Sequence, residues 1–520
     1  MARTQQPDRA PLLPLHPGPV SNGEFVPAAA SAIDRWVTQE TLRRAGESAD
    51  RLGMDRRRFL QTAGGMSAML AVLNMAACSS GQRNGARRPA VSPSSSATAT
   101  TAPGGTFTAP PPTDLPACES ALASQGEFIF DVHTHHVMPD RPWRTNAPET
   151  VNLVLGMLPA DCREADRLTC ANRAAYIHDL FLASDTTVAL LSDVPSSGPA
   201  DAPVPFDDKV GTQDMVAQLA HGGASRVLVH DVVAPNVGDV RGVLDGMAAK
   251  TAGGHVAAFK VYTAWGPTGE GFALDDPRLG LPVVQQAHDL GVKVFCGHKG
   301  LPLVQFDLRY NGPRDMVAVS RLFPDMQFVV FHGAWDPNTR EGPYDAAHAG
   351  VGINALVKAL DDHGVGPNQN VWADLGTTWR TLINQPDQAA HAVGKLLSRV
   401  GEDRVLWGTD AIWYGSPQPQ IMAFRAFQIS EEYQQRFGYP ALTDEVKRKV
   451  LGLNAATLFR LDPTATRCAL QTSGVSTGRP EQQHLVASGA LPEPWQPRGP
   501  ISRRDALSWL ASPGTHWAPG

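Results

Sequence analysis

The sequence predicts an α/β fold, a (β/α)8 TIM barrel, on three observations. Eight short apolar runs rich in Val, Ile and Phe lack the polar–apolar alternation of half-exposed strands, which favours strands buried on both faces of a parallel sheet. Patterns typical of helices separate the runs, as in DDPRLGLPVVQQAHDLG and QAAHAVGKLLSRVG. No GxGxxG follows the first run, which weighs against the rival fold, a doubly wound dinucleotide-binding sheet.

The number and spacing of the runs fit a barrel, because eight strand–helix units need roughly 250 to 350 residues. We therefore place the barrel at residues 119–463. The runs, in chain order, are EFIFDV from Glu127, TTVALLSDV from Thr186, RVLVHDVV from Arg226, HVAAFKVYT from His255, VKVFCGH from Val292, QFVVFHG from Gln327, NVWADLG from Asn370 and RVLWGTD from Arg404.

The segments on either side of the barrel differ from it in composition. Residues 1–53 are rich in Pro, Ala and polar residues without a clear period, so we interpret them as disordered or as lying upstream of the true translation start. Residues 79–118 are rich in Ser, Ala, Thr and Pro, which predicts a flexible linker. Residues 464–520 are a tail in which SRRDALSWLAS predicts one short amphipathic helix.

Residues 54–78 have the composition of an export signal. Three arginines from Arg56 precede an apolar stretch, and small residues precede Cys78, which resembles a twin-arginine signal ending in a lipoprotein cleavage box. The alternative is a transmembrane anchor, but Gly64, Gly65 and several polar residues make a poor spanning helix. We expect translation from Met54 and an exported, extracytoplasmic protein, with lipid on Cys78 as its one link to a membrane.

The bulk composition excludes several classes of function. The 520 residues carry 45 Lys and Arg against 51 Asp and Glu, a net charge of −6, so nothing indicates a nucleic-acid partner. Six cysteines without a CxxC pair indicate neither a disulfide scaffold nor a structural zinc site. Cys162 and Cys170 are near enough in sequence to bridge, and two free thiols fit equally well. We expect a small-molecule substrate, and a homo-oligomer stays open.

Polar side chains follow several of the predicted strands, and in a barrel the active site lies at the carboxyl ends of the strands. The first strand ends in DVHTHH, where the alternate residues His133 and His135 face the same side and His136 faces away. Imidazoles together with a carboxylate suit zinc first, then manganese or iron. The fifth, sixth and eighth strands end in His298, His332 and Asp410.

These motifs resemble those of the amidohydrolase-related metal-dependent hydrolases, in the decarboxylase- and lactonase-like branch of the amidohydrolase superfamily. The resemblance covers roughly residues 127–462 and rests on DVHTHH, GHKG, FHGAW, WGTDAIWYG and the closing KRKVLGLNAATLF. It implies that His332 lines the site, as a second-metal ligand or a polarising group. It implies a metal bound by His133, His135, His298 and Asp410.

A hydrolytic mechanism follows from this set of residues. A divalent metal lowers the pKa of bound water from about 15.7 towards ~7. Asp410 is then the expected base, which passes the proton to the leaving group, and His332 polarises the substrate carbonyl or holds the oxyanion. We expect a hydrolase of an amide, ester or lactone bond. The alternatives are a decarboxylase of an aromatic or unsaturated acid and a non-catalytic, lipid-tethered binding protein.

Lys260, at the end of the fourth strand, leaves the number of metals open. Binuclear members of the resembled superfamily bridge two metals with a carboxylated lysine there, which would add His332 to the ligands. Otherwise Lys260 meets a substrate carboxylate or a neighbouring acid. The resemblance to mononuclear relatives favours one metal.

Further side chains are expected around the mouth of the barrel. Arg309 is a candidate for binding a substrate carboxylate, and Cys296 is expected to pack rather than to bind metal. An aromatic pocket wall, with a loop core as the equal alternative, is expected from Tyr262, Trp265, Trp335, Trp379, Trp413 and Tyr414.

Overall fold

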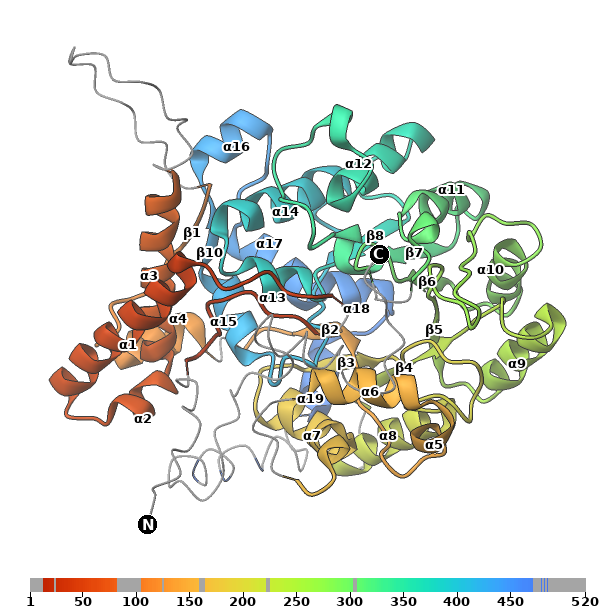
Figure 1. Cartoon of the computed structure of the whole chain (residues 1–520), viewed down its shortest axis with the longest axis horizontal. Helices are drawn as coiled ribbons and strands as arrows, with labels where there is room; N and C mark the ends of the chain where they lie inside the picture. Colours follow the sequence, from red (N-terminus) through yellow and green to blue (C-terminus); the bar gives the residue numbers. More distant parts are fainter. Residues whose placement is uncertain are drawn as a thin grey trace.

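A sheet of eight parallel strands forms the centre of the molecule in a computed structural model (Figure 1). The structure describes residues 13–22, 25–81, 104–123, 126–158, 164–220, 225–302 and 306–470, with 478, 481 and 484. The strands neighbour one another in chain order, which confirms the predicted barrel and its eight runs. They are β2 (Phe130–Thr134), β3 (Val188–Leu191), β4 (Val227–Val232), β5 (Val256–Val261), β6 (Val294–Gly297), β7 (Gln327–Val330), β8 (Val371–Asp374) and β9 (Val405–Leu406).

Hydrogen bonds between the first strand and the segment after the last strand bring the two ends of the sheet together. The backbone N–H of Val132 donates to the carbonyl of Trp407 at 3.0 Å, and that of Asp410 donates to the carbonyl of His133 at 2.9 Å. Thr134 and Ala411 form a further parallel bridge. The histidine run after β2 therefore lies directly beside Asp410.

Helices lie outside the strands and alternate with them (Figure 1). The connection from β2 to β3 holds α5 (Trp143–Asn146), α6 (Pro148–Met157) and α7 (Arg173–Ile177). The later strands are followed by α8 (Phe206–Leu219), α9 (Val240–Ala252), α10 (Gly280–Asp289), α11 (Arg314–Leu322), α12 (Gly352–His363), α13 (Thr378–Leu382) with α14 (Pro386–Arg399), and α15 (Gln418–Ala426). The chain continues through α16 (Glu431–Phe437), α17 (Asp444–Arg448), α18 (Asn454–Leu458) and α19 (Pro463–Leu470).

The strand period places the functional side chains on the inner face. One apolar cluster draws buried residues from seven of the eight strands and from α18, and it contains Ala258 and Cys296. Alternate residues of a strand share a face, so Lys260 and His298 follow Ala258 and Cys296 into the barrel. Cys296 thus packs in the core, as expected. The neighbouring Phe259 belongs to the cluster on the other side of the sheet, which includes residues of the outer helices.

The described residues before the barrel include helices α1 (Ala32–Leu52), α2 (Arg56–Leu60) and α3 (Ala63–Gly81). The expectation of disorder is wrong for residues 32–52, because Ser31 caps α1 through a capping box with Asp34 and Gly53 ends the helix in the left-handed conformation. Helix α3 contacts α1, α4 (Leu115–Leu122), α14 and α15. The signal-like segment is therefore packed against the barrel in this structure.

The polar and small residues of this segment have structural roles. The side chain of Asn74 donates to the carbonyl of Phe107 at 2.7 Å and accepts from its N–H at 2.8 Å. Ser67 donates to the carbonyl of Pro110. A side chain on Gly64 would bring its Cβ within 2.5 Å of the carbonyl oxygen of Pro112. These contacts are made to residues in the predicted linker.

The linker prediction is wrong at its carboxyl end. Strand β1 (Gly105–Phe107) pairs antiparallel with β10 (Phe427–Ile429), and α4 begins at Leu115. The pairing with β10 and the contacts to α3 supply the partners that the composition of the segment does not reveal. The central part of the linker, residues 82–103, and SRRDALSWLAS in the tail lie outside the described residues. None of the helices that the structure describes combines the length and hydropathy needed to cross a bilayer.

The packing of α3 predicts a large loss of stability when its core is cut back. Leu70 is fully buried. Leu70→Ala is expected to lower the free energy of unfolding of the full chain by about 2–5 kcal/mol, because it leaves a cavity. Leu322→Ala, at a leucine that is 59% exposed, serves as the control. Denaturant unfolding measures both, and equal small changes would show that α3 contributes little to the fold.

Candidate metal centre

The carboxyl end of β2 places two imidazoles and one carboxylate together. His133 Nε2 lies 3.5 Å from Asp410 Oδ1, and His135 Nε2 lies 3.4 Å from the same oxygen. All three side chains are at most 3% exposed. Ligand atoms bound at about 2.0–2.2 Å to one tetrahedral ion lie roughly 3.4 Å apart, so these atoms fit a single divalent cation. The structure thus brings together the residues predicted from the first and eighth strands.

The two histidines are neutral, as metal ligands must be. Burial, and then the charge of Lys260, hold the pKa of His133 and of His135 well below the ordinary value. A neutral imidazole has one nitrogen lone pair for a metal and one N–H for another partner. The orientation of each ring therefore decides which nitrogen faces the site.

Asp374, at the end of β8, fixes the orientation of His133. Its Oδ2 lies 2.9 Å from His133 Nδ1, which directs Nε2 of this ring towards Asp410. Asp374 is fully buried and also accepts from the backbone N–H of His332. A carboxylate that accepts from the far nitrogen of a ligating histidine is a common feature of metal sites. Asp374 was missed in the sequence, although its strand ends in an acid just as the eighth strand does.

Replacing Asp374 is expected to weaken metal binding without removing a ligand. In Asp374→Ala the ring of His133 loses the partner that holds its tautomer, and the metal Kd should rise about 10- to 100-fold. Competition with a metal-binding dye measures this Kd. Asp336→Asn, in the loop after His332, is the control. An unchanged Kd in Asp374→Ala would contradict the role that we give to the His133–Asp374 contact.

His332 lies beside His133, and His298 lies beside His332. His332 has φ 59°, in the left-handed region, and its Nδ1 donates to the carbonyl of Gly376 at 2.9 Å, which leaves Nε2 as the lone-pair nitrogen. Its ring centroid is 4.8 Å from that of His133 and 4.6 Å from that of His298. Among the described residues, the compact groups of ligand atoms include His332 but not His298, whose role as a ligand stays a prediction.

Lys260 lies buried between aromatic rings. Its Nζ is 4.7 Å from the ring centroid of Tyr262 and 4.3 Å from that of Phe331. Both contacts suit a cationic ammonium group. Tyr262 also stacks on His298 with centroids 5.0 Å apart. The structure therefore places Lys260 beside the predicted ligands.

The structure shows the contacts or the exposure of several other residues that the sequence analysis names. His136 turns away from the site, as expected, and its Nε2 contacts the hydroxyl of Thr212 at 3.0 Å. Cys78 is exposed near the end of α3. Trp413 stacks on His135, whereas Trp379 packs on Phe424 and Phe427 and belongs to the core. Arg309 is exposed and pairs with Asp307. The carboxylate of Asp307 therefore occupies the position that was expected for a substrate carboxylate.

An N-terminal segment crosses the mouth of the barrel, as the dark red trace in Figure 1 shows. The side chain of Asn22 donates to Asp410 Oδ2 at 2.6 Å, and the hydroxyl of Thr377 donates to the same oxygen at 2.6 Å. Phe25 packs edge-on against Trp335. Nothing in the sequence indicated these contacts, because residues 1–53 show no period from which a partner could be inferred.

The hydrogen bond from Asn22 to Asp410 predicts that the N-terminal segment lowers the activity of the site. Asn22→Ala removes one hydrogen bond to a charged group, worth about 1.5–3 kcal/mol, while the other contacts of the segment remain. The kcat/KM for p-nitrophenyl acetate is expected to rise roughly 10- to 100-fold, the factor to which this energy corresponds. Asn146→Ala, at an exposed position on α5, is the control. A fall in kcat/KM would show that Asn22 supports the reaction instead.

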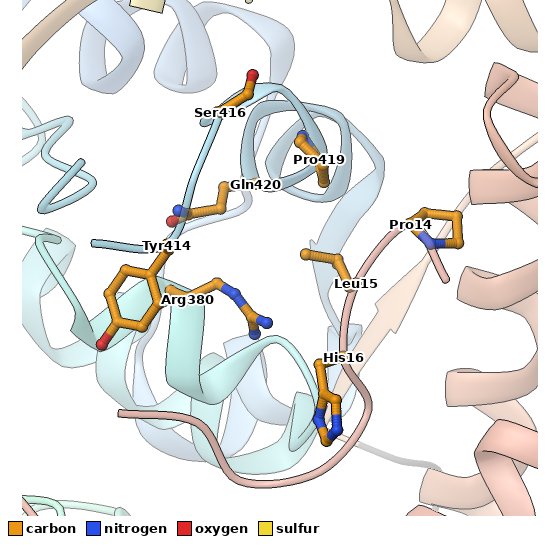
Figure 2. Close-up of a pocket in the computed structure, with 8 residues that line it drawn as sticks. All are labelled: Pro14, Leu15, His16, Arg380, Tyr414, Ser416, Pro419 and Gln420. Atoms are coloured by element: carbon orange, nitrogen blue, oxygen red, sulfur yellow. The ribbon is translucent and has the colours of Figure 1, made fainter. Parts of the chain in front are cut away.

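A small pocket lies where this segment meets the barrel. Figure 2 shows Arg380, Tyr414 and Gln420 on the barrel side and Leu15 and His16 on the N-terminal segment. Its free volume is about 10 Å³, about the space of one water molecule. The side chain of Asn384 holds the segment there, since it donates to the carbonyl of His16 at 3.0 Å.

The family model for Amidohydrolase matches residues 130–461 of the chain. The chain belongs to the amidohydrolase family. This match spans the barrel and all the candidate ligands, and members of this superfamily bind a divalent metal. The comparison with curated proteins finds no match.

Solved structures match 64–65% of the chain. One is 5-carboxyvanillate decarboxylase from Sphingomonas paucimobilis, with 14% identity, TM-score 0.42, and coverage of 65% of this chain and 100% of that one. Another is 5-carboxyvanillate decarboxylase from Novosphingobium aromaticivorans complexed with manganese, with 15% identity, TM-score 0.40, and coverage of 65% and 97%. A third is a candidate 2-pyrone-4,6-dicarboxylic acid hydrolase from Pseudomonas putida, with 14% identity, TM-score 0.38, and coverage of 64% and 97%. At these values the matches carry no argument about the reaction.

Proposed function

We propose that this amidohydrolase-family enzyme is a metal-dependent hydrolase of an amide, ester or lactone bond in a small molecule. The observation that carries the proposal is the convergence of His133 Nε2 and His135 Nε2 on Asp410 Oδ1, at 3.5 and 3.4 Å, in a buried site. A bound divalent cation supplies Lewis acidity and lowers the pKa of water from about 15.7 to about 7.

The two oxygens of Asp410 have different surroundings, which suits a base. Oδ1 faces the two imidazoles, while Oδ2 accepts from Thr377 at 2.6 Å. We assign Asp410 the removal of a proton from the attacking water and its delivery to the leaving group. His332, held by Gly376 and Asp374, sits where it can stabilise the charge that develops on the substrate oxygen.

We propose one metal per chain, zinc before manganese or iron. Two imidazole nitrogens and a carboxylate oxygen suit zinc. The second group of ligand atoms, His133 with His332 and Asp374, shares His133 with the first, and its His133–Asp374 contact of 2.9 Å has the length of a hydrogen bond. Two metals per chain, measured by elemental analysis, would instead support a carboxylated Lys260.

Metal removal and isotope labelling test the proposed reaction. Protein treated with a chelator is expected to lose hydrolysis of p-nitrophenyl acetate and to regain it with one equivalent of zinc. For an ester or lactone substrate, turnover in H₂¹⁸O should place the label in the product acid. Release of carbon dioxide, with no label in the remaining organic product, would point to decarboxylation. Binding of substrates without any turnover would point to a binding protein.

We also propose that the protein is exported and carries lipid on Cys78. The support is the signal-like composition of residues 54–78, the exposure of Cys78 and the disulfide bond of Cys170, since such bonds persist in oxidising compartments. A cut before Cys78 would remove most of α3 and the segment over the site. Mass spectrometry of the native N-terminus tests this: peptides from residues 1–53 in the mature protein would contradict it.

A further inference from the structure

Arg380, on α13, is buried at the edge of the site, and no acidic side chain among the described residues pairs with it. Its side chain is 3% exposed, and its Nη1 makes no hydrogen bond to any residue that the structure describes. The ring of Tyr414 lies 5.8 Å from the guanidinium carbon. Burial lowers the pKa of Arg380 to about 10, so the group is still cationic at neutral pH.

Two other arginines in the described chain are buried, and the guanidinium groups of both make hydrogen bonds. Arg226 donates to the backbone carbonyls of Thr186 and Thr187. Arg425 pairs with Glu127 and Asp185. A buried charge without a partner costs several kcal/mol, so proteins keep one mainly where a ligand completes the pair. Arg380 is therefore in the state expected of a residue that meets an anion from outside the chain.

Gln420 lines the same pocket as Arg380 and is also buried. It is 2% exposed, and neither its Nε2 nor its Oε1 has a hydrogen-bond partner in the described part of the chain. Figure 2 shows Gln420, Arg380 and Tyr414 on the barrel side of the pocket, with the guanidinium of Arg380 directed towards the N-terminal segment. A guanidinium and an amide N–H that line one pocket can each donate to an oxygen of the same carboxylate.

The pocket adjoins the metal centre and is closed by Pro14, Leu15 and His16 of the N-terminal segment. The hydroxyl of Tyr414 lies 3.3 Å from that of Thr377, which donates to Asp410 Oδ2. Leu15, from the N-terminal segment, lines the pocket opposite Arg380, and an alkyl side chain offers no acceptor to the guanidinium. The polar wall is thus matched to something other than this side chain of the segment.

We propose that Arg380 and Gln420 bind a carboxylate of the substrate, away from the bond that reacts at the metal. This inference rests on the proposed function and narrows it to an organic acid. Arg380 accepts a carboxylate through the planar fork of its N–H groups, and Gln420 Nε2 donates to the same group. The N-terminal segment leaves the pocket when the acid enters, because both occupy the same space.

Binding of benzoate and of its neutral counterpart benzamide to the metal-depleted full chain tests the proposal. Without metal, the carboxylate cannot bind to a metal ion, and no turnover is needed, so failure of hydrolysis leaves this test standing. Calorimetry should show that wild type binds benzoate at least tenfold more tightly than benzamide. Arg380→Gln should remove the difference, and Gln420→Leu should reduce it. Arg309→Gln, at the exposed arginine paired with Asp307, should leave it unchanged.

Thermal unfolding separates a binding role from a structural one. Arg380→Gln removes an uncompensated buried charge, so its Tm should equal or exceed that of wild type. Arg380→Lys keeps the charge without the fork and should retain part of the preference for benzoate. Equal affinity of wild type for benzoate and benzamide would overturn the proposal. So would an Arg380→Gln variant that binds benzoate as tightly as wild type, or one whose Tm falls by many degrees.

Discussion

Asp410→Asn is expected to lower kcat for p-nitrophenyl acetate by about 10²- to 10⁴-fold, the contribution of a positioned general base. The substitution keeps the shape of the side chain and an oxygen that can accept from Thr377. It removes the carboxylate that takes the proton. It also removes a negative charge that balances the charge of a bound cation. The loss of activity should therefore occur in a protein that unfolds at a similar temperature.

The control for this substitution is an exposed aspartate in an ion pair. Asp361 pairs with Arg399 on the surface, and Asp361→Asn should change kcat by less than about twofold, because surface pairs contribute little. Metal content is measured on the same samples. If Asp410→Asn holds its metal and keeps kcat within about threefold of wild type, another group is the base.

His135→Ala is expected to abolish both metal binding and turnover, because it removes one of the two imidazoles that face Asp410 Oδ1. The chain offers a matched control at the next residue. His136 is equally buried, but its ring contacts Thr212, so His136→Ala should cost stability and keep the metal. Elemental analysis after gel filtration measures the metal. Retention of a full equivalent in His135→Ala would contradict the ligand assignment.

The strands and their order could be predicted from the sequence because each strand is buried on both faces. Burial on both sides requires a short continuous apolar run, and the eight such runs became β2 to β9. The same reasoning placed His133 and His135 on one side and His136 on the other. Asp374 was within reach of this argument, since it ends β8 as Asp410 follows β9.

The N-terminal region could not be predicted, because its partners lie far away in the sequence. The polar atoms of Asn74 meet a strand that begins 31 residues later, and Asn22 meets Asp410 across most of the chain. From composition alone, we predicted an export signal, a flexible linker and a disordered segment for this region. Similarly, exposure distinguishes Arg309 from Arg380, and exposure is a property of the fold rather than of the local sequence.

The position of the metal is the central claim, and anomalous diffraction at the zinc edge from crystals of the zinc-loaded protein tests it most directly. We expect one strong peak per chain, bounded by His133 Nε2, His135 Nε2 and Asp410 Oδ1. A second strong peak beside Lys260 would contradict the single metal. A chain with no peak between these three atoms would contradict the site itself.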